Sequence, residues 1–171
     1  MSTAAIPMTT RDNSLLTAII KTGLAVGVSD GIFASLTGML IPPVVTPLRV
    51  FRGVASVLIG KQALDGGLPA GLLGIGMHFF VATFWSTLFV LAIRYSPTLR
   101  DAINSNAKAL LVAALYGMGI WMFMSLVFIP AMVHRPPTIT TKWWVQLFGH
   151  IPFVVGPMIL VNRDKRDLPS S

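Results

Sequence analysis

Residues 21–43, with the sequence KTGLAVGVSDGIFASLTGMLIPP, begin at a lysine, continue through an apolar run and end at two prolines. The run over residues 22–41 has the length of a membrane-spanning helix, because about 20 residues cross a hydrocarbon core about 30 Å thick. Proline cannot continue a helix without losing a backbone hydrogen bond, and that loss is costly in lipid. We therefore predict a transmembrane helix that carries one acidic residue, Asp30, near its centre.

Three further apolar runs of similar length follow, over residues 68–93, 109–129 and 143–161. Each ends at a charged or polar residue or, in the third run, at Pro130. The composition agrees, since 54% of the residues are hydrophobic and 11% are charged, whereas soluble domains carry about 25% charge. We therefore expect a single integral membrane domain over residues 1–171, an all-α bundle of four transmembrane helices in contact with the lipid bilayer.

The basic residues of the chain flank the apolar runs and do not gather on one face, so the net charge of +7 does not indicate nucleic-acid binding. With four spans, both termini lie on one side, which collects eight basic residues: Arg11, Lys21, Arg94, Arg100, Lys108, Arg163, Lys165 and Arg166. The other side has five: Arg49, Arg52, Lys61, Arg135 and Lys142. The positive-inside rule then predicts cytoplasmic N- and C-termini. The polar start of the chain does not resemble a secretory signal.

The segment after the first span is apolar, but its charges leave too short a run to cross the membrane. Residues 48–63 predict an amphipathic helix with an apolar face of Phe51, Val54, Ala55, Leu58 and Ile59. The opposite face is small or basic, with Arg49, Arg52, Gly53, Ser56 and Gly60. Such a helix either caps the bundle as an interfacial connector or dips into it as a lid or substrate-contacting re-entrant helix. The candidate headgroup contacts are Arg49, Arg52, Lys61, His134 and Arg135.

Three ionisable residues fall at similar depths in three different spans: Asp30, His78 and His150. An aspartate at the bilayer centre costs roughly 2.5–3.5 kcal/mol even on lenient scales, so it needs a compensating partner. Gln146 lies one turn before His150 and is a possible fourth member. Such a cluster could be a hydrogen-bond network that holds the bundle together, a proton or ion relay, or a metal site of two imidazoles and a carboxylate. The sequence leaves all three open.

Small residues recur every four positions on the first span, at Gly23, Gly27 and Gly31. This pattern lets another helix approach closely, and it places Asp30 on a face that points at a neighbour and not at lipid. The neighbour is either another span of the same chain or a second chain. We therefore consider a homo-oligomer or a membrane partner that binds through this stripe.

Two features of the fourth run predict its local structure. Trp143 and Trp144 stand at its start, as in an aromatic belt at the membrane interface. Pro152 and Pro157 lack the N–H groups that would bond the carbonyls four residues earlier. We expect a kink just past His150 for this reason.

No enzymatic signature is recognisable. The chain has no glutamate and no cysteine, and its glycines do not form a phosphate-binding loop. We assign no catalytic residue, no cofactor and no metal ligand. The remaining hypotheses are a structural or accessory membrane protein with a buried polar layer, a small proton- or ion-coupled carrier that uses the Asp/His cluster, and a membrane metal-binding protein.

Residues 49–81 resemble a widespread group of bacterial four-helix inner-membrane proteins, similar in outline to the YagU-like domain of unknown function. The matching positions are Ala55, Ser56, Gly60, Lys61, Gly66, Gly67, Gly74, His78 and Phe79. The elements HRPP at residues 134–137 and FGH at residues 148–150 are similar but less specific. The resemblance implies a multi-pass protein of the bacterial inner membrane without an assigned activity.

Overall fold

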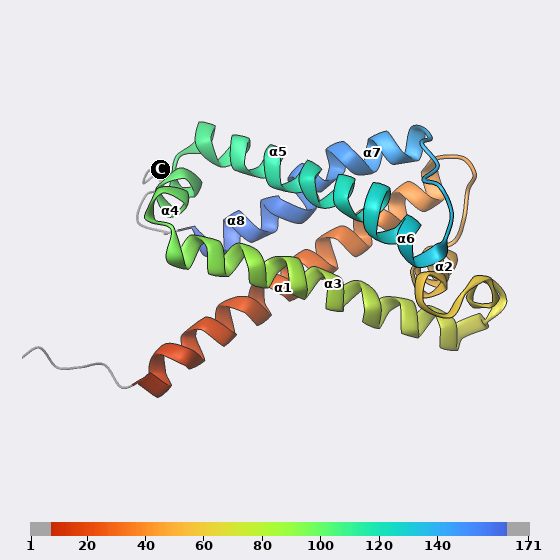
Figure 1. The fold of residues 1–171 in the computed structure, drawn as a ribbon, viewed down its shortest axis with the longest axis horizontal. Coiled ribbons are helices and arrows are strands. Elements are labelled where there is room, and N and C mark those ends of the chain that lie inside the picture. Colours follow the sequence, from red (N-terminus) through yellow and green to blue (C-terminus); the bar gives the residue numbers. More distant parts are fainter. Residues whose placement is uncertain (1–7, 164–171) are drawn as a thin grey trace, which may run out of the picture.

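The computed structural model describes residues 8–163, with only the backbone for residues 8–14. These residues are all-α (Figure 1). The elements are α1 (Met8–Leu40), α2 (Pro47–Ile59), the 3₁₀ turn η1 (Lys61–Asp65), α3 (Gly67–Tyr95), α4 (Pro97–Asn104), α5 (Asn106–Phe123), the π-helical turn η2 (Met124–Phe128), α6 (Ile129–Val133), α7 (Thr141–His150), the π-helical turn η3 (Ile151–Val155) and α8 (Gly156–Asn162).

Four of the described helical stretches are long and apolar enough to cross a membrane. They are Leu15–Leu40, Gly67–Tyr95, Asn106–Val133 and Thr141–Asn162. We refer to them as spans one to four. The predicted fold class is confirmed: an all-α chain with four spans and a short helix, α2, between the first two. Their length and composition make the chain a multi-pass membrane protein.

The structure corrects two details of the predicted spans and adds a short helix between spans two and three. Span three does not end at Pro130, because α6 continues the helix to Val133. Span four contains the π-helical turn η3 at Pro152, where we expected only a kink. A wider turn accommodates a proline because the local hydrogen-bond pattern can shift around the missing N–H. The short helix α4 between spans two and three was not predicted, although Ser96 caps its start and Pro97 is its first residue.

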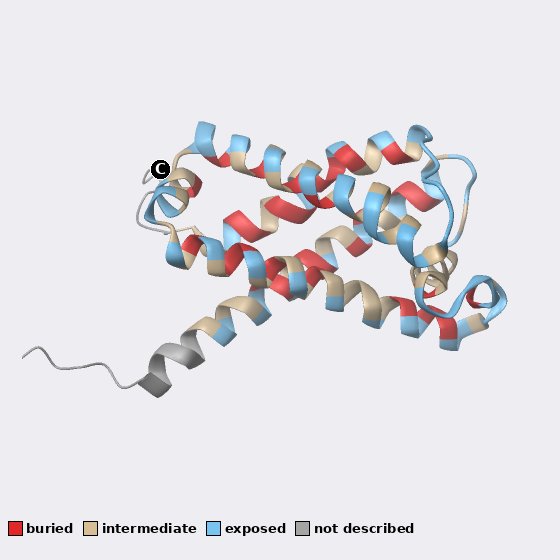
Figure 2. Ribbon diagram, viewed as in Figure 1, coloured by how far each residue is buried: buried red, intermediate tan, exposed pale blue. Residues whose placement is uncertain are grey.

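Spans two and four pack on α1, and span three packs on span four. Helix α1 contacts α3, η3 and α8, while α5 contacts α7 and η3. Spans two and three meet through aromatic side chains: the ring centroids of Trp85 and Tyr116 lie 6.2 Å apart, and the Tyr116 hydroxyl donates a hydrogen bond of 2.9 Å to the Trp85 carbonyl. Buried and exposed positions alternate along the helices of the bundle (Figure 2). The outer surface carries large apolar side chains such as Leu24, Ile32 and Phe80, as lipid contact requires.

Helix α2 closes one end of the bundle, where it contacts α1, α3 and α6 (Figure 1). Thr46 caps its start by accepting a hydrogen bond from the Arg49 N–H. Ala55 is fully buried, whereas Leu58 and Ile59 are exposed, so only part of the predicted apolar face packs on protein. A Cβ added at Gly74 of α3 would overlap the Phe51 carbonyl oxygen. The α2 backbone therefore lies against α3 at a distance that only glycine allows.

The glycine stripe of α1 is used within the chain. Gly23, Gly27 and Gly31 are buried, and a Cβ at each would meet Thr83, Phe79 or His78 of α3. The prediction that this stripe binds a second chain is therefore wrong, because span two already covers it. Close packing of small residues is the interaction that brings two helices together in lipid.

The ends of the spans carry the expected basic residues. Arg94, Arg100 and Lys108 lie on α3, α4 and α5 near the junctions of these helices, and Arg163 after α8 donates to the Asn104 carbonyl of α4. Lys21 adjoins Thr22, which accepts a hydrogen bond from Asn162 at the end of α8, so these basic residues lie near one end of the bundle. Three other basic residues were predicted on that side. Lys165, Arg166 and the side chain of Arg11 lie outside the described part of the chain. Trp143 does not belong to an interfacial belt: it is 8% exposed, and its indole N–H donates to the Ser125 hydroxyl at 3.0 Å. Trp144 is exposed, as predicted.

Candidate functional site

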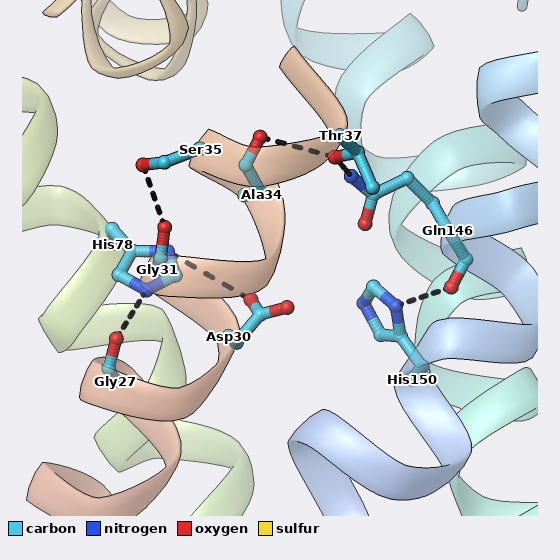
Figure 3. Close-up of polar contacts among 9 residues, drawn as sticks. All are labelled: Gly27, Asp30, Gly31, Ala34, Ser35, Thr37, His78, Gln146 and His150. Carbon is cyan, nitrogen blue, oxygen red and sulfur yellow. Dashed lines mark hydrogen bonds and ion pairs between the residues drawn. The ribbon is translucent and has the colours of Figure 1, made fainter. Parts of the chain in front are cut away.

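The Asp30 carboxylate faces the imidazole of His78. Oδ2 of Asp30 lies 3.9 Å from Nδ1 of His78, and both side chains are largely buried, with 19% and 11% exposed. The neighbouring Gly31 makes room for the imidazole, because a Cβ at that position would lie 3.4 Å from the His78 Nε2. Spans one and two thus bring together two of the residues that the sequence placed at the same depth (Figure 3).

The second ring nitrogen of His78 determines where a proton can reside. Nε2 lies 2.9 Å from the Gly27 carbonyl oxygen, which can only accept a hydrogen bond, so Nε2 must carry a hydrogen. In the neutral ring, Nδ1 is then an acceptor that faces a carboxylate, and two acceptors repel each other. A proton between them removes this repulsion, either as imidazolium with carboxylate or as neutral imidazole with carboxylic acid. At 3.9 Å the two atoms are too far apart for a hydrogen bond, so the contact is an ion pair when the imidazole is protonated.

His150 lies on the other side of Asp30, in span four (Figure 3). Its Nδ1 donates to the Gln146 carbonyl at 2.7 Å, which leaves Nε2 as an acceptor in the neutral ring. The Gln146 amide donates to the Thr37 hydroxyl at 2.9 Å and does not bond Asp30. Figure 3 therefore shows two separate groups of hydrogen bonds, one around His78 and one around Gln146, with the Asp30 carboxylate between them.

These side chains line one partly open cavity of about 470 Å³. All four spans and α2 contribute to its wall, which is mostly apolar. Its polar members include all four residues predicted as an intramembrane cluster: Asp30, His78, Gln146 and His150. Ligand sites in proteins are commonly apolar cavities of roughly 300–1,000 Å³ with a few convergent polar groups.

Three polar atoms of the cavity-lining residues are buried without a hydrogen-bond partner: Asp30 Oδ1, Trp85 Nε1 and Trp121 Nε1. Buried polar atoms are rarely left unpaired, because desolvation without a partner costs about 1–3 kcal/mol. The Trp121 ring also contacts His150, with centroids 4.9 Å apart. Unpaired polar atoms therefore belong to three residues of the cavity wall, one of them the Asp30 carboxylate.

Sequence reasoning missed the two tryptophans and the part played by α2. Trp85 follows His78 by seven residues, two helical turns along the same face, and this spacing could have identified it. Trp121 lies in an aromatic-rich run without a comparable signal. Gly53 and Ser56 of α2 line the cavity, so the small face of this helix contacts the interior of the bundle.

The candidate headgroup residues divide into two groups. Lys61, His134 and Arg135 are exposed. Arg49 instead donates to the Leu64 carbonyl and lies 3.6 Å from the Asp65 carboxylate, and so links α2 to η1. The Nε of Arg52 is buried without a hydrogen-bond partner.

No group of three histidine, cysteine or acidic side chains within the described part of the chain is arranged to hold a metal ion. Asp30, His78 and His150 line the same cavity but do not form such a group. The metal-binding hypothesis therefore has no geometric support among residues 15–163.

No known protein family, no curated protein and no solved structure matches this chain. The resemblance to the YagU-like group stays a prediction, and the function must be argued from the site itself.

Proposed function

We propose that this chain is a small proton-linked carrier of the bacterial inner membrane, with cytoplasmic termini and one membrane domain over residues 1–171. Its central cavity accepts a solute, and the Asp30–His78 pair takes up and releases a proton as the solute moves. We also propose that Lys61, His134 and Arg135 contact lipid headgroups and that the chain is related to the YagU-like group.

One observation carries this proposal: the Asp30–His78 pair lies on the wall of a cavity at the centre of the spans. A pair that only locked two helices together would need no space beside it. Ionisable residues inside membranes most often mark ion or proton pathways, because their insertion cost is otherwise uncompensated. Trp85 and Trp121 line the same cavity and offer aromatic surface to a solute.

The pair suits proton exchange because its protonated form is neutral overall. An imidazolium at His78 balances the charge of the Asp30 carboxylate, and release of its proton leaves one negative charge on the cavity wall. His78 keeps its Nε2 hydrogen bond to Gly27 in both forms, so the ring need not rotate. Histidine exchanges protons near neutral pH, the range in which a carrier works.

Proton flux in liposomes tests this function. Purified protein is reconstituted into vesicles that contain a pH-sensitive dye and a set of cationic, neutral and anionic organic solutes, and an inward proton gradient is imposed. We expect proton entry with the parent protein and with Asp101→Asn, whose aspartate lies exposed on α4. Asp30→Asn is nearly isosteric but has no charge to pair with the imidazole, so its flux should fall to that of empty vesicles. A parent protein without pH-dependent flux, or an Asp30→Asn variant with normal flux, contradicts the carrier.

A structural or accessory role is the second candidate, favoured by the hydrogen bonds that join different spans. His78 bonds Gly27 across spans two and one, Gln146 bonds Thr37 across spans four and one, and the Asn162 amide donates to the Thr22 hydroxyl at 2.9 Å. Thermal unfolding of the same Asp30→Asn protein separates the two roles. A carrier predicts a folded variant without flux, whereas a purely structural network predicts lower thermal stability and no flux in the parent.

A further inference from the structure

The cavity carries one acidic side chain and no lysine or arginine. Among its lining residues, Asp30, His78 and His150 are the only titratable groups. Asp30 comes from α1, His78 from α3 and His150 from α7, while α5 and α8 contribute no charged residue. Arg49 and Arg52 lie on α2, but the residues with which α2 lines the cavity are small or apolar. With both imidazoles neutral, the ionised Asp30 carboxylate therefore gives the cavity wall a net negative charge.

The rest of the wall suits a large apolar body with a delocalised or shielded positive charge. Trp85 of span two and Trp121 of span three both line the cavity. Aromatic faces attract cations, and they do so most strongly for tryptophan and in the absence of water. Met77 and Met124 add polarisable, adaptable contacts. A small hydrated metal ion would not contact most of the apolar and aromatic side chains of this wall.

We propose that the cavity binds a hydrophobic organic monocation, such as a quaternary ammonium ion with an aromatic group. The positive group lies near the Asp30 carboxylate, and the apolar part packs among Trp85, Trp121 and the two methionines. The cation replaces the proton of the His78 imidazolium: one positive charge arrives beside the Asp30 carboxylate, and one proton leaves the imidazole for the solvent. This inference deepens the proposed carrier by naming its substrate class, and it rests on that proposal for the exchange of the proton.

Isothermal titration calorimetry of the full chain in detergent tests the proposal. The probes are phenyltrimethylammonium and its uncharged analogue tert-butylbenzene, in which carbon replaces nitrogen. Titration in two buffers of different ionisation enthalpy counts the protons released. We expect saturable binding of the cation with about one proton released, and binding of the neutral analogue weaker by at least about tenfold. Equal affinity for both probes, or no binding of the cation, overturns the proposal.

Asp30→Asn gives a second, independent comparison. We expect it to weaken cation binding at least about tenfold, to abolish proton release and to leave binding of the neutral analogue unchanged. Asp101→Asn is the matched control and should bind like the parent. An Asp30→Asn variant that binds the cation like the parent overturns the proposal. If this variant does not fold, the comparison of the two probes on the parent protein still tests whether the cavity binds the cation.

The result is distinguishable from failure of the carrier itself. Proton flux in vesicles without cation binding in detergent means that the carrier stands and the substrate class is wrong. Cation binding that depends on Asp30, without any flux, means that the site binds organic cations but the chain does not transport protons.

Discussion

At the scale of single residues, the site follows from the hydrogen-bonding limits of a few atoms. The Gly27 carbonyl can only accept, so the His78 ring must donate from Nε2 and turn Nδ1 toward Asp30. The depth of Asp30, His78 and His150 could be predicted by counting residues from the ends of each span. Their distances could not, because a shift of one residue in helix packing turns a side chain by about 100°.

Replacing His78 tests its hydrogen bond across two spans. His78→Asn places an amide that is too short to reach the Gly27 carbonyl and leaves Asp30 without the imidazole. We expect the free energy of unfolding to fall by roughly 1–3 kcal/mol, because buried polar groups lose their partners. Thermal or denaturant unfolding in detergent measures it. His134→Asn is the matched control, since His134 is exposed and its left-handed backbone, with φ of 53°, suits asparagine. Similar losses in both variants would contradict this role.

At the scale of elements, apolar run length predicted the four spans, and charge placement predicted the amphipathic α2. Proline positions misled the prediction at Pro130, because the π-helical turn before it lets the helix continue. Single-sequence patterns contain no signal for such a turn. Both π-helical turns contribute to the cavity, through Met124 and Phe128 of η2 and Val154 of η3. π-Helical turns inside α-helices are often found at functional sites.

The contact between α2 and α3 gives a matched pair of glycines on one helix. Gly74→Ala would force a Cβ into the Phe51 carbonyl, whereas a Cβ at Gly76 has no heavy atom within 4 Å. We expect Gly74→Ala to destabilise the protein by roughly 1–3 kcal/mol through overpacking. Gly76→Ala should be neutral or stabilising by roughly 0.5–1 kcal/mol, because alanine favours the helix. Unfolding of both variants in detergent checks this. If both alanines are tolerated equally, α2 does not pack on α3 as described.

At the scale of the whole molecule, four spans place both termini on one side and the α6–α7 connection on the other (Figure 1). The sequence predicted this topology from span number alone. It could not predict the cavity, because the cavity arises from how α2, η2 and η3 fit between the spans. The outer surface is apolar along the bundle and basic at its ends, as a bilayer requires.

Cysteine labelling checks the topology directly, because the chain has no cysteine of its own. Asp101→Cys and Thr138→Cys each introduce one thiol at an exposed position, on α4 and in the α6–α7 connection. In intact bacterial cells, a thiol reagent that cannot cross the inner membrane should label Thr138→Cys and not Asp101→Cys. Both should react after the membrane is opened. Labelling of Asp101→Cys alone would reverse the proposed orientation, and labelling of both in intact cells would contradict four spans.

The central claim, that the Asp30 carboxylate and the His78 imidazole act as one proton-exchanging pair, is tested most directly by nitrogen NMR of histidine-labelled protein in bilayers. The chain has three histidines, so each ring can be assigned by substitution. We predict that Nε2 of His78 stays protonated across the pH range, that its Nδ1 signal changes with pH, and that Asp30→Asn alters this change while Asp101→Asn does not. A His78 ring protonated only on Nδ1, or a pH response that Asp30→Asn leaves intact, would contradict the pair.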